Sequence, residues 1–151
     1  TTSGAWNNTS PTSSVWTMGS SFADGSTQVA YCWAQVAGFS QFGSYTGNGS
    51  SDGPFVYLGF RPSFIMIKRT DSTGDWYMYD TSRSPYNYAY QWLRADTSEV
   101  ENTSGTSNNW EIDILSNGFK VRNNGAFDNA NGGSYIYMAF AENPFKYANA
   151  R

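Results

Sequence analysis

The stretch that most constrains the fold of this chain is FRPSFIMIKRTDSTGDWYMYD, which runs from residue 60 to residue 80. Two runs rich in β-branched and aromatic residues flank Asp71-Ser72-Thr73-Gly74, whose glycine permits a tight reversal, so the stretch is predicted to form a β-hairpin. Both strands carry apolar side chains on both faces, as Ile65 and Met66 illustrate. Such a hairpin is expected in the middle of a sheet, covered on both sides by the rest of the chain or by a neighbouring subunit.

The rest of the chain repeats this pattern of short apolar runs separated by turn residues. No stretch has a convincing helical period, and the spacing of the turns is typical of sandwiches and barrels. The sequence therefore predicts an all-β fold, an antiparallel β-sandwich of about ten strands. Besides the hairpin, the expected strands are Gln28–Val36, Phe39–Tyr45, Phe55–Leu58, Tyr86–Leu93, Trp110–Leu115, Phe119–Arg122 and Tyr135–Glu142, with two weaker ones around Ala5 and at Val15–Met18.

The length of 151 residues suits a single domain with one core. Residues 1–27 differ from the rest, because isolated aromatic residues stand there among Ser, Thr, Asn and Gly. We therefore expect an N-terminal arm or edge strands over residues 1–27 and a β-sandwich domain over residues 28–151.

Composition excludes several classes of function. The net charge is −3 with only nine Lys and Arg, which argues against nucleic-acid binding. Histidine is absent and there is one cysteine, so Ser-His-Asp, Cys-His and zinc-hydrolase chemistry are excluded, and no cofactor is predicted. That cysteine, Cys32, lies in the apolar run QVAYCWAQV and is expected to be a small buried hydrophobic residue.

Membrane insertion is not expected either. No apolar run approaches the ~18 residues of a membrane span, and TTSGAW at the start has neither the basic nor the hydrophobic region of a signal peptide. We expect either a mature or excised piece of a protein or a chain that does not use a secretory signal.

Aromatic residues make up 18% of the chain and charged residues 14%, a balance that favours neutral, hydroxyl-rich partners. Sugar rings stack on exposed Trp and Tyr, while polar groups nearby bind the hydroxyls. The alternative for each of these aromatic residues is the core or a subunit interface. The best predicted glycan-binding set consists of Tyr86, Tyr88, Tyr90 and Trp92, beside Arg83 and Arg94.

One segment, Trp110-Glu111-Ile112-Asp113-Ile114, resembles the catalytic strand of the laminarinase-type glycoside hydrolases, which are jelly-roll sandwiches. The resemblance implies Glu111 as nucleophile and Asp113 as its neighbour. The motif continues to another glutamate one or two positions later, where this chain has Leu115 and Ser116, so the acid/base position of retaining hydrolysis is empty. No catalytic residue is therefore assigned and the chain is predicted not to be an enzyme, with a degenerate hydrolase as an alternative.

Two acidic segments are candidates for a calcium loop. Asp71, Asp75 and Asp80 lie near Lys68 and Arg69, and Phe127–Gly133 is a second acidic, Asn-rich turn. Neither has the alternating ligands and terminal glutamate of an EF-hand, and ion pairing accounts for the first set equally well. No metal site is predicted.

Several segments together resemble a domain of tailed-phage and marine-virus structural proteins, in particular the tail-fibre-like and capsid-fibre-like chains. These segments are YCWAQVAGFSQFGSYTGNGSSDGPFVYLGFRPSFIMIKRTD, DILSNGFKVR and SYIYMAFAENPFK, and the resemblance runs from about Val29 to Arg151. It implies a jelly-roll or concanavalin-A-like sandwich on the virion surface, assembled in the host cytoplasm, which fits a chain without disulfides.

From this resemblance and the aromatic surface we expect a non-enzymatic virion structural module that engages host-surface glycans. Its other partners would be further virion proteins and copies of itself, and a trimer is one arrangement that would fit. The alternative is a purely structural decoration or fibre-assembly domain, whose aromatic residues all lie in subunit contacts.

Overall fold

The structure is a computed structural model that describes residues 3–22, 25–103 and 110–142. The chain forms two compact units, Thr1–Trp33 and Ala34–Arg151. Within the described residues the fold is all-β, with eight strands in two antiparallel sheets and one short helix. No helix in these residues has the length and apolar character needed to cross a membrane.

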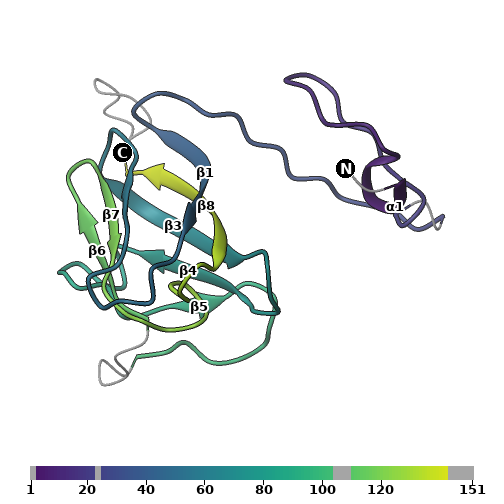
Figure 1. The fold of residues 1–151 in the computed structure, drawn as a ribbon. Helices are drawn as coiled ribbons and strands as arrows, with labels where there is room; N and C mark the ends of the chain where they lie inside the picture. The colour runs from purple at the N-terminus through teal and green to yellow at the C-terminus, as the bar shows by residue number, and fades with distance from the viewer. Residues whose placement is uncertain (1–2, 23–24, 104–109, 143–151) are drawn as a thin grey trace. The chain divides into compact units, whose positions relative to one another are not determined.

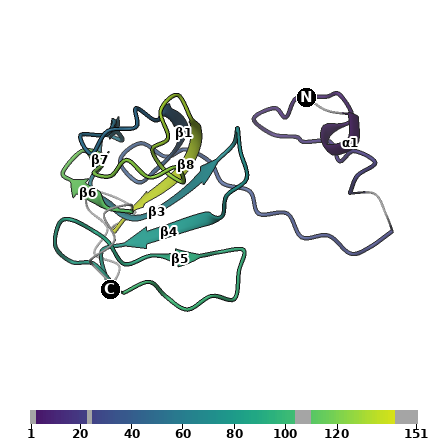
Figure 2. The ribbon, with the colours of Figure 1, turned by 60° about the horizontal axis from the view of Figure 1, so that its bottom comes forward.

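The two sheets lie in the second unit. The larger has five strands in the order β1 (Ser40–Thr46), β8 (Ser134–Ala141), β3 (Pro62–Arg69), β4 (Trp76–Asp80) and β5 (Leu93–Arg94). The smaller has three, in the order β2 (Phe55–Tyr57), β7 (Gly118–Val121) and β6 (Ile112–Leu115). Figures 1 and 2 show β8, β3, β4 and β5 side by side, with β6 and β7 in the other sheet.

The predicted central hairpin is confirmed. Strands β3 and β4 pair antiparallel, with Ile65 opposite Tyr79 and Ile67 opposite Tyr77, and they occupy the middle of the larger sheet. These four side chains are completely buried, whereas Met66 and its neighbours on the other face are only half-buried. One face of the hairpin therefore belongs to the core, and the other is not fully covered within the described residues.

The two sheets enclose a common core in a sandwich-like arrangement. Phe119 of β7 meets Tyr45 of β1 and Tyr137 of β8 edge to face, with ring centroids 6.2 and 5.6 Å apart. Aromatic rings prefer this geometry because the positive ring edge meets the negative ring face. The core residues of the sheets include Val56, Ile65, Ile67, Tyr77, Tyr79, Ile112, Ile114, Phe119, Val121, Tyr135, Tyr137 and Ala139.

Five further predicted strands are found with bounds that shift by one or two residues. Strands β2 and β6 lie inside the predicted ranges Phe55–Leu58 and Trp110–Leu115. Strands β1, β7 and β8 correspond to the predicted ranges Phe39–Tyr45, Phe119–Arg122 and Tyr135–Glu142, but β1 extends one residue further to Thr46, and β7 and β8 begin one residue earlier, at Gly118 and Ser134. In β2, β6, β7 and β8 a buried side chain alternates with a more exposed one over at least part of the strand, and in β1 the half-buried Tyr45 lies between the exposed Ser44 and Thr46.

The prediction of a strand at Gln28–Val36 was wrong. Only Val36 makes a β-bridge, with Ser40, and the side chain of Tyr31 is 74% exposed. The segment has the residue types of a strand, but a strand forms only where a neighbouring strand accepts its backbone hydrogen bonds. The prediction that Cys32 is buried was also wrong, because its side chain is exposed.

The strand predicted at Tyr86–Leu93 was wrong over most of its length, since β5 comprises only Leu93 and Arg94. The side chain of Asn87 takes the place of a strand residue there. Its Nδ2 donates to the Ile114 carbonyl (3.0 Å), and its Oδ1 accepts from the Ile114 N–H (2.8 Å). Ala89 then bridges to Ile112. A side-chain amide that pairs with β6 thus replaces a regular ladder.

The first unit contains no strand among its described residues, so the strands predicted around Ala5 and at Val15–Met18 were wrong. Ala5 lies in helix α1 (Ser3–Trp6), and Asn7 and Asn8 follow it in the left-handed conformation, which Asn tolerates. The Ala5 carbonyl accepts a hydrogen bond from the Gly19 N–H (2.8 Å), which holds the following loop against the helix. Local bonds of this kind compete with a β-ladder in Ser- and Thr-rich sequence.

Candidate binding site

The first unit contains a cleft that we call the aromatic cleft. It is lined by Trp6, by residues 11–16 and by residues 30–33, which include Trp16, Tyr31 and Trp33. Its volume is about 550 Å³. No charged side chain lines it, and its polar groups are the hydroxyls of Ser13, Ser14 and Tyr31, the Cys32 thiol and the Trp indole N–H groups, while the Thr12 hydroxyl bonds within its own turn. The cleft therefore offers ring faces and neutral hydrogen-bonding groups, and its volume is in the range of small-ligand sites.

The rings of the aromatic cleft form two contacting pairs. Trp6 and Trp16 meet edge to face, with centroids 6.2 Å apart and an angle of 84° between their planes. Tyr31 and Trp33 are stacked at 6.1 Å with an angle of 19°. Large parts of these rings are open to solvent, since the Trp16 side chain is 41% exposed and the Trp33 side chain 54% exposed.

A second cavity of about 400 Å³ adjoins the aromatic cleft. It shares Trp6, Trp16 and Ala30 with the cleft and is otherwise lined by Met18, Phe22, Gln28 and Val29. The Trp6–Trp16 pair therefore borders both cavities. An elongated ligand could contact both cavities along this pair.

The polar rim of the aromatic cleft is held by a local turn. The N–H of Thr12 donates to the Val15 carbonyl (2.8 Å), and its Oγ1 accepts from the Val15 N–H (3.0 Å) and the Ser14 N–H (3.3 Å). These bonds fix the backbone between Pro11 and Trp16 without a sheet. The side chains of Ser13 and Ser14 are exposed on this turn.

The predicted glycan-binding set is exposed only in part. Tyr86 is 84% exposed, and the exposed Tyr88 ring meets the half-buried Tyr90 ring edge to face at 6.2 Å. Trp92 lies in the core and contacts Tyr77 and Trp110. Glycan binding by Tyr86, Tyr88 and Tyr90 stays a prediction, whereas the Trp92 ring is only 7% exposed and offers little surface to a ligand.

The two predicted arginines of that set are held by acidic partners. Arg94 pairs with Asp75 (3.1 Å) and Glu99, and its guanidinium lies 5.0 Å from the centroid of the Trp92 ring. Arg83 pairs with Asp80 and lies 3.6 Å from a carboxylate oxygen of Glu101. Both guanidinium groups thus serve contacts within the fold.

Of the two carboxylates of the hydrolase-like segment, Asp113 lies on the side of β6 that faces away from the core, and Glu111 precedes the strand and is buried. Burial raises the pKa of Glu111, which is nearly inaccessible. Asp113 pairs with Arg122 at 3.3 Å and lies opposite Lys120 of β7. The ion pair with Arg122 gives Asp113 a structural role in the fold.

The calcium candidates near the hairpin tip are each paired with an arginine. Asp71 binds Arg69 (2.7 Å), Asp75 binds Arg94 and Asp80 binds Arg83. This confirms the ion-pair interpretation of these residues. In the part of the chain that the structure describes, no three Asp, Glu or Cys side chains form a group that could hold a metal ion.

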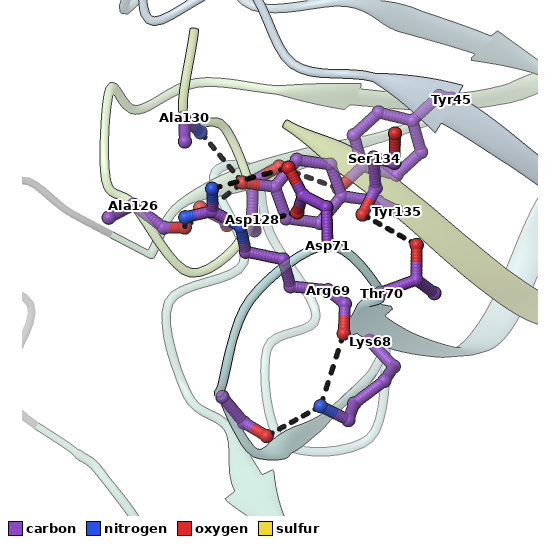
Figure 3. Close-up of polar contacts among 11 residues, drawn as sticks. Tyr45, Lys68, Arg69, Thr70, Asp71, Ala126, Asp128, Ala130, Ser134 and Tyr135 are labelled. Atoms are coloured by element: carbon purple, nitrogen blue, oxygen red, sulfur yellow. Dashed lines mark hydrogen bonds and ion pairs between the residues drawn. The ribbon is translucent and has the colours of Figure 1, made fainter. Parts of the chain in front are cut away.

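The second calcium candidate, the loop from Phe127 to Gly133, is part of a polar network at one end of the sheets. Figure 3 shows Arg69 reaching from β3 between the Asp71 carboxylate and the Ala126 carbonyl (2.8 Å). The Tyr135 hydroxyl donates to the same carbonyl (3.0 Å) and accepts from the Ala130 N–H (2.7 Å). The backbone of this loop is therefore held by side chains of β3 and β8.

Asp128 lies at the buried side of this network. Its Oδ2 accepts from Asn123 Nδ2 (2.8 Å), and its main-chain carbonyl accepts from the Tyr45 hydroxyl (2.7 Å). Burial raises the pKa of Asp128 to about 7, although the hydrogen bond from Asn123 acts in the opposite direction. Complete burial makes Asp128 a structural residue, since no ligand in solvent can reach it.

Sequence reasoning missed the aromatic cleft because it placed residues 28–36 in a sheet. The signal was present in Trp6 and Trp16, which stand in a segment of Ser, Thr, Asn and Gly too polar to form a core of its own.

No curated protein and no solved structure is detectably similar to the chain. One family does match, over residues 1–144, a span that includes the first unit with its cleft and most of the second unit. The chain therefore belongs to the family described as domain of unknown function DUF7483.

Proposed function

We propose that this chain is a non-enzymatic binding module that takes neutral glycans in the aromatic cleft of its first unit. The observation that carries the proposal is a cleft of about 550 Å³ lined by four aromatic rings and several hydroxyl groups, without a charged side chain. Sugars present flat C–H faces, which pack on aromatic rings, and hydroxyl groups, which need hydrogen-bonding partners. The cleft supplies both.

The absence of basic side chains from both cavities supports a neutral ligand. Anionic glycans would require clustered Lys or Arg, and none of these lines either cavity. The adjoining cavity across the Trp6–Trp16 pair favours an oligosaccharide over a single sugar, since the two cavities together extend beyond one ring.

For the second unit we propose a jelly-roll or concanavalin-A-like sandwich. The support is the antiparallel pairing of all strands and a core shared by the five-stranded and the three-stranded sheet. In this proposal the second unit is the scaffold, and the first unit presents the ligand site.

The setting we propose is a virion surface, with the chain as a structural module of tail-fibre or head-fibre type and as a homo-oligomer with other virion proteins as neighbours. This part rests on the sequence resemblance stated above. Electron microscopy of the assembled particle with a labelled antibody against the module would test it, since the label should decorate the particle surface.

Calorimetric titration with neutral oligosaccharides, chosen from a glycan array, tests the ligand proposal. Trp16→Ala removes a ring that borders both cavities and should weaken binding about tenfold or more, which corresponds to ~1.4 kcal/mol. Tyr57→Ala is the control, because Tyr57 is also an exposed aromatic residue but lies on β2 of the other unit, and it should leave the affinity unchanged. Absence of any glycan signal, or equal loss in both variants, would contradict the proposal.

A further inference from the structure

Strand β1 is an edge strand of the five-stranded sheet, with β8 on one side only. Just outside the strand, the Phe39 carbonyl accepts from the Ala141 N–H (2.7 Å) and the Gly47 N–H donates to the Gly133 carbonyl (2.9 Å). In an antiparallel ladder the residues that bond to one neighbour alternate along the strand. The odd-numbered residues from 39 to 47 therefore bond toward β8, and the even-numbered ones direct their backbone groups to the open edge.

One end of this edge is already paired. Ser40 exchanges two backbone hydrogen bonds with Val36, at 2.9 and 3.1 Å. Beyond it, Phe42, Ser44 and Thr46 have no backbone partner on the open side within the described residues. Each has one N–H and one C=O, so a row of alternating donors and acceptors faces outward. Such a row is a template for another strand.

The strand also lacks the features that usually prevent such pairing. Its sequence SQFGSYT contains no charged residue and no proline, and its register with β8 has no bulge. Ser44 at its middle is small and exposed, whereas Gly43 leaves room for the Tyr137 ring of β8. The opposite edge of the sheet, β5, has only two residues.

We propose that a second copy of this chain pairs with β1 across a two-fold axis, with Ser44 opposite Ser44 and Phe42 opposite Thr46. An antiparallel edge is complementary to itself under a two-fold rotation, since each N–H then meets a C=O of the other copy. This register satisfies the donors and acceptors of all three open residues. A second copy also brings to the edge a strand without a charged residue or a proline.

The side chains on the outer face of the sheet agree with this arrangement. Phe42, Met138, Met66, Met78 and Leu93 form a row of directly paired residues across the five strands, and all five are half-buried. Pairing at β1 continues this uncharged row into the second copy, without bringing like charges together. Met and Phe are residue types enriched at subunit contacts. A closed two-fold pair implies an even number of copies, in contrast to the trimer considered from the sequence.

Disulfide cross-linking tests the register. In hydrogen-bonded antiparallel pairs the Cα atoms lie about 5.5 Å apart, which a disulfide can span. In a Cys32→Ser background, which removes the exposed native thiol, Ser44→Cys should form a covalent dimer on mild oxidation. Ser116→Cys, at the exposed turn between β6 and β7, is the matched control and should stay monomeric.

Light scattering on the unmodified chain gives a second, independent readout. We expect twice the chain mass of 16.7 kDa, and Ser44→Asp, which places two carboxylates opposite each other, should return the mass to that of one chain. Circular dichroism would verify that this variant remains folded. A monomeric wild-type chain at all concentrations, or equal cross-linking of Ser44→Cys and Ser116→Cys, would overturn the proposal.

Discussion

At the residue scale, Asp128 is the side chain whose environment departs most from what its chemistry prefers. It is completely buried, and neither its Oδ1 nor the buried hydroxyl of Tyr79 has a hydrogen-bond partner in the described structure. Burial raises the pKa of the Tyr79 hydroxyl well above its usual value, and the charge of Asp128 raises it further. The protonated form of Asp128 is therefore the one that the fold accommodates best.

Asp128 should make the stability of the protein depend on pH. The folded state holds the proton up to about pH 7, whereas the unfolded chain releases it near pH 4. This stabilisation is complete below pH 4, is lost as the pH rises toward 7, and is absent above that, with a total of roughly 4 kcal/mol. Asp128→Asn should remove most of this decline, measured by denaturant unfolding at intervals from pH 4 to pH 8.

Asp52→Asn is the control for this experiment. A hydrogen bond from Lys120 and its charge lower the pKa of Asp52, so any contribution from this exposed group is present at neutral pH and is lost as the pH falls below 4. An unchanged decline between pH 4 and pH 7 in Asp128→Asn would show that Asp128 is not its source.

At the element scale, the hairpin of β3 and β4 has one face in the core and one at the surface. Ile67 is completely buried between Tyr77 and Tyr137, which are its partners on the two neighbouring strands. Met66 is the next residue and points to the opposite, half-buried face. Because both residues lie on the same strand, their truncation compares the two faces directly.

Ile67→Ala should lower the free energy of unfolding by about 2–5 kcal/mol, since it leaves a cavity between the sheets. Met66→Ala should cost clearly less, because solvent can reach the space that its side chain leaves. Thermal or denaturant unfolding of both variants measures the difference. Equal losses would mean that the outer face of the hairpin is as tightly covered as the inner one.

Strand prediction from sequence succeeded where the local pattern and the pairing partners agree. The hairpin around Gly74, the Asn117-Gly118 turn and the segment from Tyr135 carry both signals, and each appears as paired strands. Gln28–Val36 has the residue pattern of a strand, but no neighbouring strand pairs with it in the described structure. At Tyr86–Leu93 the partner β6 is present, but the side chain of Asn87 occupies its backbone groups, and no periodicity of apolar residues reports such an amide.

At the scale of the whole molecule, the candidate site shows the same limit of sequence reasoning. The excess of aromatic residues correctly indicated that some rings remain exposed, and Tyr86 is one of them. The sequence could not assign each ring to the core or to the surface, because the burial of a ring depends on contacts with residues elsewhere in the chain. Trp92 is buried by Tyr77 and Trp110, which come from other segments of the chain, whereas Trp16 meets Trp6 edge to face and lines the aromatic cleft.

If the ligand binds in the first unit, the indole N–H signals of the tryptophans in the two units should respond differently to it. The chain has six tryptophans, of which Trp6, Trp16 and Trp33 line the aromatic cleft, while Trp76, Trp92 and Trp110 belong to the second unit. Each indole N–H gives a separate signal in a proton–nitrogen spectrum. A ligand that binds in the cleft must therefore perturb the first group and spare the second.

The most direct test of the account is a titration of the nitrogen-15-labelled chain with a neutral oligosaccharide, followed on these six indole signals. The account predicts saturable shifts of the Trp6, Trp16 and Trp33 signals and no change at Trp76, Trp92 and Trp110. Shifts confined to the second group, or no shift with any neutral glycan, would contradict it.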